Sequence, residues 1–239
     1  MTFANDAFAG RHVLVVGGSS GIGAGIAQAF AAHGASVRVT GATPAEVAKV
    51  DALSAGALDV RDGAAVKALI DGLPALDVLV NCAGVIRRGL EHEPEAFAEV
   101  VDINLNGTMR CCAAARAKLA ERRGCIVNTA SMLSFFGGGL VPGYSASKGG
   151  VAQLTKSLAI AYAEQGIRVN ALAPGWIATP LTEALQNDPA RSDTILARTP
   201  LGRWGTPADV AGAALFLASP AAAFVTGVVL PVDGGYLIS

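Results

Sequence analysis

The feature of this sequence that most constrains its fold is an alternation of short, β-branched apolar runs with longer stretches of helical periodicity. This alternation predicts a parallel sheet, because parallel neighbours need a crossover connection, usually a helix. The runs are predominantly apolar, which indicates a sheet covered on both faces. The expected strands are Val13–Val16, Val37–Thr40, Ala57–Val60, Val78–Val80, Ile126–Thr129, Val169–Ala173 and Val228–Val232. The expected helices are Gly23–Ala32, Ala64–Ile70, Asn106–Arg122, Ser145–Gln165 and Ala208–Ala218.

The size and charge of the chain narrow its class. Its 239 residues are expected to form a single α/β domain over residues 1–239, a doubly wound parallel seven-stranded sheet with helices on both faces, the Rossmann fold. Hydrophobic residues make up 52% and charged residues 15%, which suits a large buried core. The net charge is −1 and no basic block stands out, so we expect no nucleic-acid partner.

The sequence carries no recognisable targeting signal or metal-binding pattern. Its first ten residues resemble neither a secretory signal nor an organellar leader, and no run approaches the roughly 18 apolar residues of a membrane span. We therefore expect a cytoplasmic protein with no membrane partner. The cysteines have no metal-ligand spacing, so we expect no metal and reduced core thiols at Cys82, Cys111, Cys112 and Cys125.

A glycine-rich loop follows the first expected strand and opens the first expected helix. Gly17 suits a tight turn, Gly21 permits close backbone approach to a pyrophosphate, and Gly23 permits close packing of the helix. The N-terminus of that helix favours an anion. A glycine cluster alone is also an ordinary strand-to-helix turn. Its position between the first strand and the first helix, however, is that of a dinucleotide-binding loop.

A second set of residues is typical of proton transfer. Tyr144 and Lys148 lie four residues apart at the start of an expected helix and so share one face. A tyrosine, with an ordinary pKa of about 10, acts as a base only where positive charge stabilises its phenolate, and Lys148 can supply that charge. Ser131, at the end of the strand Ile126–Thr129, can hydrogen-bond a substrate oxygen. Asn104, before another helix, can hold a water that connects Lys148 to solvent.

Each of these residues alone also has a structural explanation, as a helix-surface pair or as a cap. Together and in this order they resemble the short-chain dehydrogenase/reductase family, over almost the whole chain from Val13 to Gly235. Two family positions differ, because Val16 stands where Thr is usual and Cys82 replaces the second Asn of Asn-Asn-Ala-Gly. The late family markers are Pro174-Gly175 and Asp233-Gly234-Gly235.

The resemblance implies an NAD(P)-dependent oxidoreductase that moves a hydride between nicotinamide and a carbonyl or secondary-alcohol carbon of a small molecule. It also implies a homotetramer, for which small residues on the long helix (Ala152, Ala159 and Ala163) suit close helix contacts. The implied catalytic residues are Asn104, Ser131, Tyr144 and Lys148. The implied cofactor contacts are Gly17, Ser19, Ser20, Gly21, Ile22, Gly23, Asp59, Val60, Asn81, Ala83, Gly84, Tyr144, Lys148, Pro174, Gly175, Ile177 and Thr179.

The choice between NAD and NADP stays open, and we favour NAD. An acidic residue near the end of the second strand would bind the ribose diol of NAD and repel the 2′-phosphate of NADP. The sequence there, Thr40-Gly41-Ala42-Thr43, offers neither a carboxylate nor an arginine.

Several stretches resemble sugar-acid dehydrogenases of the family, namely 2-dehydro-3-deoxy-D-gluconate 5-dehydrogenases and gluconate 5-dehydrogenases. They are Cys82–Arg88, Ala130–Phe135 and Arg198–Gly205. Arg87 or Arg88, with Arg203 ranked lower, can hold a substrate carboxylate bidentately. The alternative is that Arg87 and Arg88 serve subunit contacts or solvent.

The mixed segment 176–203 is expected to form a substrate lid over the carboxyl ends of the strands. Two other functions stay open. One is a general ketoreductase of the 3-oxoacyl thioester type, and the other is a non-catalytic nucleotide-sensing scaffold. A scaffold of that kind typically lacks the Tyr or the Lys, and this chain has both.

Overall fold

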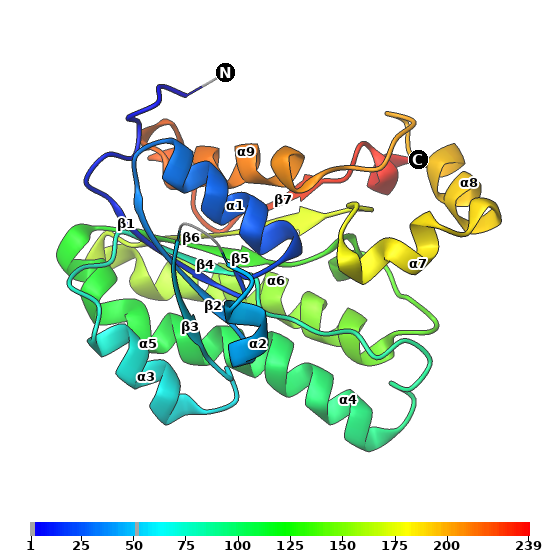
Figure 1. Cartoon of the computed structure of the whole chain (residues 1–239), viewed down its shortest axis with the longest axis horizontal. Helices are drawn as coiled ribbons and strands as arrows, with labels where there is room; N and C mark the ends of the chain where they lie inside the picture. The colour runs from blue at the N-terminus through cyan, green and yellow to red at the C-terminus, as the bar shows by residue number, and fades with distance from the viewer. Residues whose placement is uncertain (1–2, 51–52) are drawn as a thin grey trace.

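The core of the molecule is one parallel sheet, seen in a computed structural model that describes residues 3–50 and 53–239 (Figure 1). Its strands pair in the order β3-β2-β1-β4-β5-β6-β7, and every neighbouring pair is parallel. The bounds are β1 (His12–Val16), β2 (Ser36–Gly41), β3 (Ser54–Ala57), β4 (Val78–Asn81), β5 (Cys125–Thr129), β6 (Arg168–Pro174) and β7 (Val229–Val232). The strand order reverses between β1 and β4, where ligands bind in folds of this type.

Helices cover both faces of this sheet, which confirms the doubly wound fold predicted from the sequence. One face packs against α1 (Gly21–Ala32) and α9 (Pro207–Ala218). The other face packs against α3 (Gly63–Asp71), α5 (Gly107–Arg122) and α6 (Pro142–Tyr162). Side chains of β1 alternate between the two cores, since Val13 and Val15 face the first and Leu14 and Val16 the second.

Two predicted boundaries are wrong. The third strand was expected at Ala57–Val60, but β3 ends at Ala57, so Asp59 and Val60 follow the strand instead of ending it. Leu58 and Val60 are apolar because they pack into the core beyond the end of the strand, where the Leu58 nitrogen still donates to β2, at the Gly41 carbonyl. The helix expected at Ser145–Gln165 begins at Pro142, where proline fits the first helical position, and its last residues form a 3₁₀ turn, Ala163–Gln165.

The segment 176–203 is more regular than its sequence indicates. It contains a 3₁₀ turn (Pro180–Thr182), α7 (Glu183–Gln186) and α8 (Pro189–Arg198), drawn in yellow and orange in Figure 1. These elements are too short to show a clear period. Two other helices, α2 (Pro44–Val47) and α4 (Pro94–Val101), were also not predicted.

The helical spacing of Val151, Leu154, Leu158 and Ala161 predicts one apolar stripe along the long helix α6, and the buried stripe differs from it in part. Val151 and Leu158 are buried as expected, but Ala161 is exposed and Tyr162 is buried in its place. Ala152 and Ala159 are also buried within the chain, so they are not available for the contacts between subunits that the sequence suggested. In the described ranges, no helix is both long enough and apolar enough to span a bilayer.

The cysteines occupy two environments. All four are free, as expected, and Cys111, Cys112 and Cys125 lie in the core, where burial raises the pKa of each thiol. Cys82 follows β4 and is only half-buried, because it packs against the core on one side and lines a surface cleft on the other; burial raises the pKa of its thiol too.

Candidate active site

The glycine loop between β1 and α1 is shaped by close backbone approaches. Gly17 has φ +77° and Gly21 has φ +54°, both in the left-handed region that favours glycine. A Cβ at Gly17 would lie 2.5 Å from the Ala83 nitrogen, and one at Gly23 would lie 2.1 Å from the Gly17 oxygen. Any larger side chain at these two positions would therefore displace backbone.

A long cleft of about 690 Å³ runs along this loop. Thirteen of the predicted cofactor contacts line it, namely Gly17, Ser19, Ser20, Gly21, Ile22, Gly23, Asp59, Val60, Ala83, Gly84, Tyr144, Lys148 and Thr179. The first turn of α1 opens onto the cleft without a side-chain cap, because Ser20 forms no capping hydrogen bond. Uncapped amides at a helix N-terminus bind phosphate. The cleft therefore fits a dinucleotide.

Four predicted cofactor contacts lie elsewhere. Pro174, Gly175 and Ile177 line a neighbouring cavity instead. Asn81 is buried in the sheet, where its Nδ2 donates to the Asn128 Oδ1 at 2.9 Å, so it does not line the cleft. This hydrogen bond joins β4 to β5 directly before the loop that follows β4.

The neighbouring cavity has a volume of about 310 Å³ and is lined mostly by apolar side chains, among them Met132, Phe136 and Trp176. Ser131 and Tyr144 also line it. Tyr144 and Thr129 border both the cleft and this cavity. The two spaces therefore meet at Tyr144.

Tyr144 and Lys148 lie one turn apart at the start of α6, as their spacing predicts. The Lys148 Nζ is 5.6 Å from the centroid of the Tyr144 ring and donates to the Thr129 carbonyl at 2.6 Å. Burial lowers the pKa of Lys148 to about 8. Burial also raises the pKa of the Tyr144 phenol, the Ser131 hydroxyl opposes this rise, and the charge of Glu91 adds to it.

Asn104 lies within a helix and not before one, because a π-helical turn, Asp102–Asn106, joins α4 to α5. Such turns recur at functional sites. The Asn104 amide accepts from the Val85 nitrogen at 2.8 Å and donates to the Val85 carbonyl at 3.0 Å and to the Ser147 Oγ at 3.1 Å. A Cβ at Gly84 would lie 3.3 Å from the Asn104 Oδ1 and 3.7 Å from the Lys148 Nζ, so both groups border Gly84.

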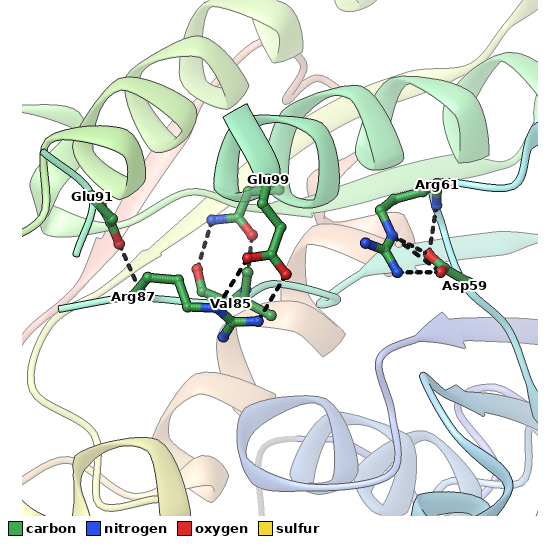
Figure 2. A network of polar contacts seen from close by, with 7 residues as sticks. Asp59, Arg61, Val85, Arg87, Glu91 and Glu99 are labelled. Atoms are coloured by element: carbon green, nitrogen blue, oxygen red, sulfur yellow. Dashed lines mark hydrogen bonds and ion pairs between the residues drawn. The ribbon is translucent and has the colours of Figure 1, made fainter. Parts of the chain in front are cut away.

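The three candidate arginines occupy different places. The Arg87 guanidinium is bidentate on Glu99, at 3.1 and 3.0 Å, and it borders the cleft (Figure 2). Arg203 pairs with Asp209 at 2.8 Å and lines a third cavity. Arg88 lines the cavity next to Tyr144 and forms no hydrogen bond or ion pair within the described part of the chain.

Two carboxylates with roles in this region were missed by the sequence analysis. Glu91, only 1% exposed, accepts from the Arg87 nitrogen and from the Tyr144 nitrogen, each at 2.7 Å (Figure 2 shows the first bond). It joins the loop after β4 to the first turn of α6. Its neighbours His92 and Glu93 are exposed, so the sequence there resembles a solvated charged run. The other is Glu46, which lines the cleft beside Ser19.

Comparison with known proteins gives consistent matches over nearly the full chain. A family model described as enoyl-(acyl carrier protein) reductase matches residues 16–237. The 2-dehydro-3-deoxy-D-gluconate 5-dehydrogenase of Bacillus subtilis (strain 168) is 41% identical, covering 99% of this chain and 99% of the relative. The cis-4-hydroxycyclohexanecarboxylate dehydrogenase of Sinomonas cyclohexanicum is 44% identical, covering 97% and 98%.

A solved structure extends the similarity to three dimensions. The gluconate 5-dehydrogenase of Burkholderia cenocepacia J2315, in complex with NADP and tartrate, superposes with a TM-score of 0.92 at 35% identity, covering 98% of each chain. These sequence relatives and this matching fold agree with the family that the glycine loop, the sheet order and the Tyr-x-x-x-Lys helix of this chain indicate. The chain belongs to the short-chain dehydrogenase/reductase family and is an NAD(P)-dependent oxidoreductase.

Proposed function

We propose that the protein interconverts a secondary alcohol and a ketone on a small carboxylated compound, a sugar acid such as 2-dehydro-3-deoxy-gluconate. The observation that carries this proposal is Arg88. Among the described residues that line the cavity next to Tyr144, it is the one charged side chain, and it has no carboxylate partner there. An exposed guanidinium at the edge of an otherwise apolar cavity is suited to a bidentate contact with a substrate carboxylate.

The relatives support this substrate class. The names of the Bacillus subtilis and Sinomonas cyclohexanicum relatives both denote an alcohol or ketone substrate that carries a carboxylate. Arg87, which the sequence placed level with Arg88, is a weaker candidate, because Glu99 already neutralises its guanidinium. The same holds for Arg203 and Asp209.

The roles proposed for the site residues follow from their positions. Tyr144 exchanges a proton with the substrate oxygen, since its phenol borders both cavities. Ser131 orients that oxygen. Lys148, as a buried cation beside the Tyr144 ring, favours the phenolate. Asn104 and Lys148 both border Gly84, and we assign to Asn104 the water that returns protons from Lys148 to solvent. A nicotinamide cofactor in the cleft supplies or accepts the hydride.

Further parts of the proposal concern the whole molecule. We propose NAD as the preferred cofactor, a cytoplasmic location and a single catalytic domain whose lid is the segment 176–203.

We also propose a homotetramer. Large apolar side chains that are 80% exposed or more support assembly, because a monomer would leave them in water: Ile160, Phe224 and Ile238. Light scattering at micromolar concentration tests the assembly, and a monomeric mass would contradict it.

The substrate class is tested by comparing kcat/KM for carboxylated and for neutral ketones and alcohols, measured from the absorbance of the reduced cofactor at 340 nm. Arg88→Ala should lower kcat/KM for carboxylated substrates roughly ten- to hundredfold, since a charge-assisted bond contributes about 1.5–3 kcal/mol, and should spare neutral ones. Arg87→Ala and Arg203→Ala are the matched controls, expected to affect both substrate types equally. Equal losses of kcat/KM for carboxylated and neutral substrates in Arg88→Ala would contradict the proposed contact between Arg88 and the substrate carboxylate.

A second candidate function is a reductase of acyl thioesters, which the description of the matching family model favours. The mostly apolar lining of the cavity also suits an acyl chain. Including 3-oxoacyl thioesters in the same substrate panel separates the two. A preference for thioesters that survives Arg88→Ala would favour the second candidate.

A further inference from the structure

The end of β2 has a carboxylate that its own sequence lacks. Beyond Gly41 the chain turns into the short helix α2, and Glu46 lies in the first turn of that helix. Its side chain folds back toward the strand, where the Oε2 atom accepts from the Ala42 nitrogen at 2.9 Å and from the Ser19 Oγ at 3.5 Å. Glu46 is exposed, so this carboxylate is held at the surface of the cleft and accessible from it.

The packing around Gly41 explains how Glu46 reaches this position. A Cβ at Gly41 would lie 2.9 Å from the Ser19 Oγ and 3.0 Å from the Glu46 Cβ. Only a residue without a side chain lets the glycine loop and α2 approach each other so closely. Ser19, Gly41, Ala42, Thr43 and Glu46 line one stretch of the cleft together.

The charges along the cleft do not favour a phosphate at this stretch. Among the described residues that line it, the cations are Arg61, Arg87 and Lys148. Arg61 is bidentate on Asp59 (Figure 2), Arg87 is bidentate on Glu99, and Lys148 lies beside Tyr144. Arg38 and Lys49, which flank this stretch in sequence, are not lining residues.

We propose that Glu46 determines the cofactor preference, accepting hydrogen bonds from the adenosine ribose diol of NAD and repelling the 2′-phosphate of NADP. In folds of this type an acidic residue near the end of the second strand performs this selection, and here a residue of the following helix occupies the corresponding place. The inference rests on the nicotinamide cofactor of the proposed function and deepens its preference for NAD.

Binding of the dinucleotides alone tests this proposal, without any substrate. NADH and NADPH are titrated separately into the wild-type protein, Glu46→Gln and Glu46→Lys, with calorimetry giving each Kd. Glu164→Gln is the matched control, because Glu164 is an exposed carboxylate beyond the far end of α6 from Tyr144. The wild type and the control should bind NADH roughly tenfold or more tightly than NADPH, as a like-charge contact near the surface predicts.

Glu46→Gln should reduce that preference roughly tenfold, mainly through tighter NADPH binding, and Glu46→Lys should reverse it. An NADH Kd in Glu46→Gln within about threefold of the wild type would show that the cleft is intact, since a neutral amide keeps hydrogen-bonding capacity. Equal affinities in the wild type, or a ratio unchanged in both Glu46 variants, would overturn the role of Glu46 while leaving the proposed function in place. Failure of both dinucleotides to bind would contradict the proposed function as well.

Discussion

The residues around Tyr144 and the segment 176–203 border the same cavity but are built in opposite ways. We refer to Glu91, Asn104, Thr129, Tyr144 and Lys148 as the catalytic frame. Five of the seven contacts described above for these residues join a side chain to backbone, and Glu91, Asn104 and Lys148 are each less than 5% exposed. In the segment 176–203, by contrast, Leu181 is 61% exposed and Leu201 is 68% exposed.

The segment 176–203 is tied to the rest of the molecule at few points. At its base Ile177 forms a β-bridge with Gly205, and most of its other hydrogen bonds are internal, such as that from the Gln186 Nε2 to the Thr182 Oγ1. Local stability follows buried contacts, so this segment should open more easily than the frame. From this difference we propose that the frame sets the rate of the chemical step and that the segment 176–203, as a lid, sets substrate binding.

The largest effect should come from the frame. Tyr144→Phe removes the proton donor and keeps the ring, so kcat should fall roughly 10²–10⁴-fold while the Kd for the cofactor changes little. Steady-state rates and cofactor titration measure the two quantities. A kcat like that of the wild type in this variant would contradict proton transfer by Tyr144. It would also contradict the proposal that the frame, and not the lid, sets the rate of the chemical step.

The two regions were also unequal in what the sequence could predict. The frame contains Tyr144 and Lys148, whose fixed spacing on one helix is a local pattern, and the structure brings them together with Ser131 as expected. Glu91 could not be found in this way. It meets Tyr144 across 53 residues of chain through a hydrogen bond to backbone, and such a bond puts no constraint on the partner's side chain.

Elsewhere, prediction succeeded where burial repeats with a period and failed where it does not. The strands β1, β4 and β6 are mostly apolar because helices cover both faces of the sheet, and this pattern is visible in a single sequence. Leu58 and Val60 are just as apolar but lie in a loop, so the third strand was displaced. The helices α7 and α8 were missed because each covers one to three turns and buries a single residue.

A smaller effect is expected from the burial of Lys148. Its pKa is lowered to about 8 from an ordinary 10.5, so between these values the unfolded chain holds one proton more than the folded chain. The free energy of unfolding should therefore rise with pH in this window, by about 1–3 kcal/mol from this residue. Above the ordinary pKa of tyrosine, the raised pKa of Tyr144 acts in the opposite sense, because the unfolded phenol loses its proton first.

Urea denaturation at pH 7, 8, 9 and 10 measures this rise in the cofactor-free protein. Lys148→Met should abolish the part that Lys148 contributes, and Lys156→Met, at an exposed lysine of the same helix, should not. A wild-type profile that is unchanged by Lys148→Met would mean that the frame carries no buried cation.

The smallest effect should come from the lid. The Arg198 guanidinium at the end of α8 lies 5.4 Å from the ring centroid of Phe136 and 4.2 Å from that of Tyr236, and Phe136 lines the substrate cavity. A cation–π contact at an exposed site is worth about 0.5–1 kcal/mol, so Arg198→Ala should raise KM roughly two- to fivefold and leave kcat nearly unchanged. Arg191→Ala is the matched control, because Arg191 pairs with Asp188 within the lid itself.

Limited proteolysis adds a readout that the rates do not give. Cofactor and substrate together should protect the segment 176–203 in the wild type and in Arg191→Ala, since closure would bring the lid against the cavity. Protection should need higher substrate concentrations in Arg198→Ala, by the same factor as the rise in KM. A fall in kcat with KM unchanged would instead make Arg198 part of the frame. That outcome would mean that the segment 176–203 is already closed over the cavity without substrate, so that substrate has no open state to shift. The exposed side chains Leu181 and Leu201 would then have no role in closing the lid.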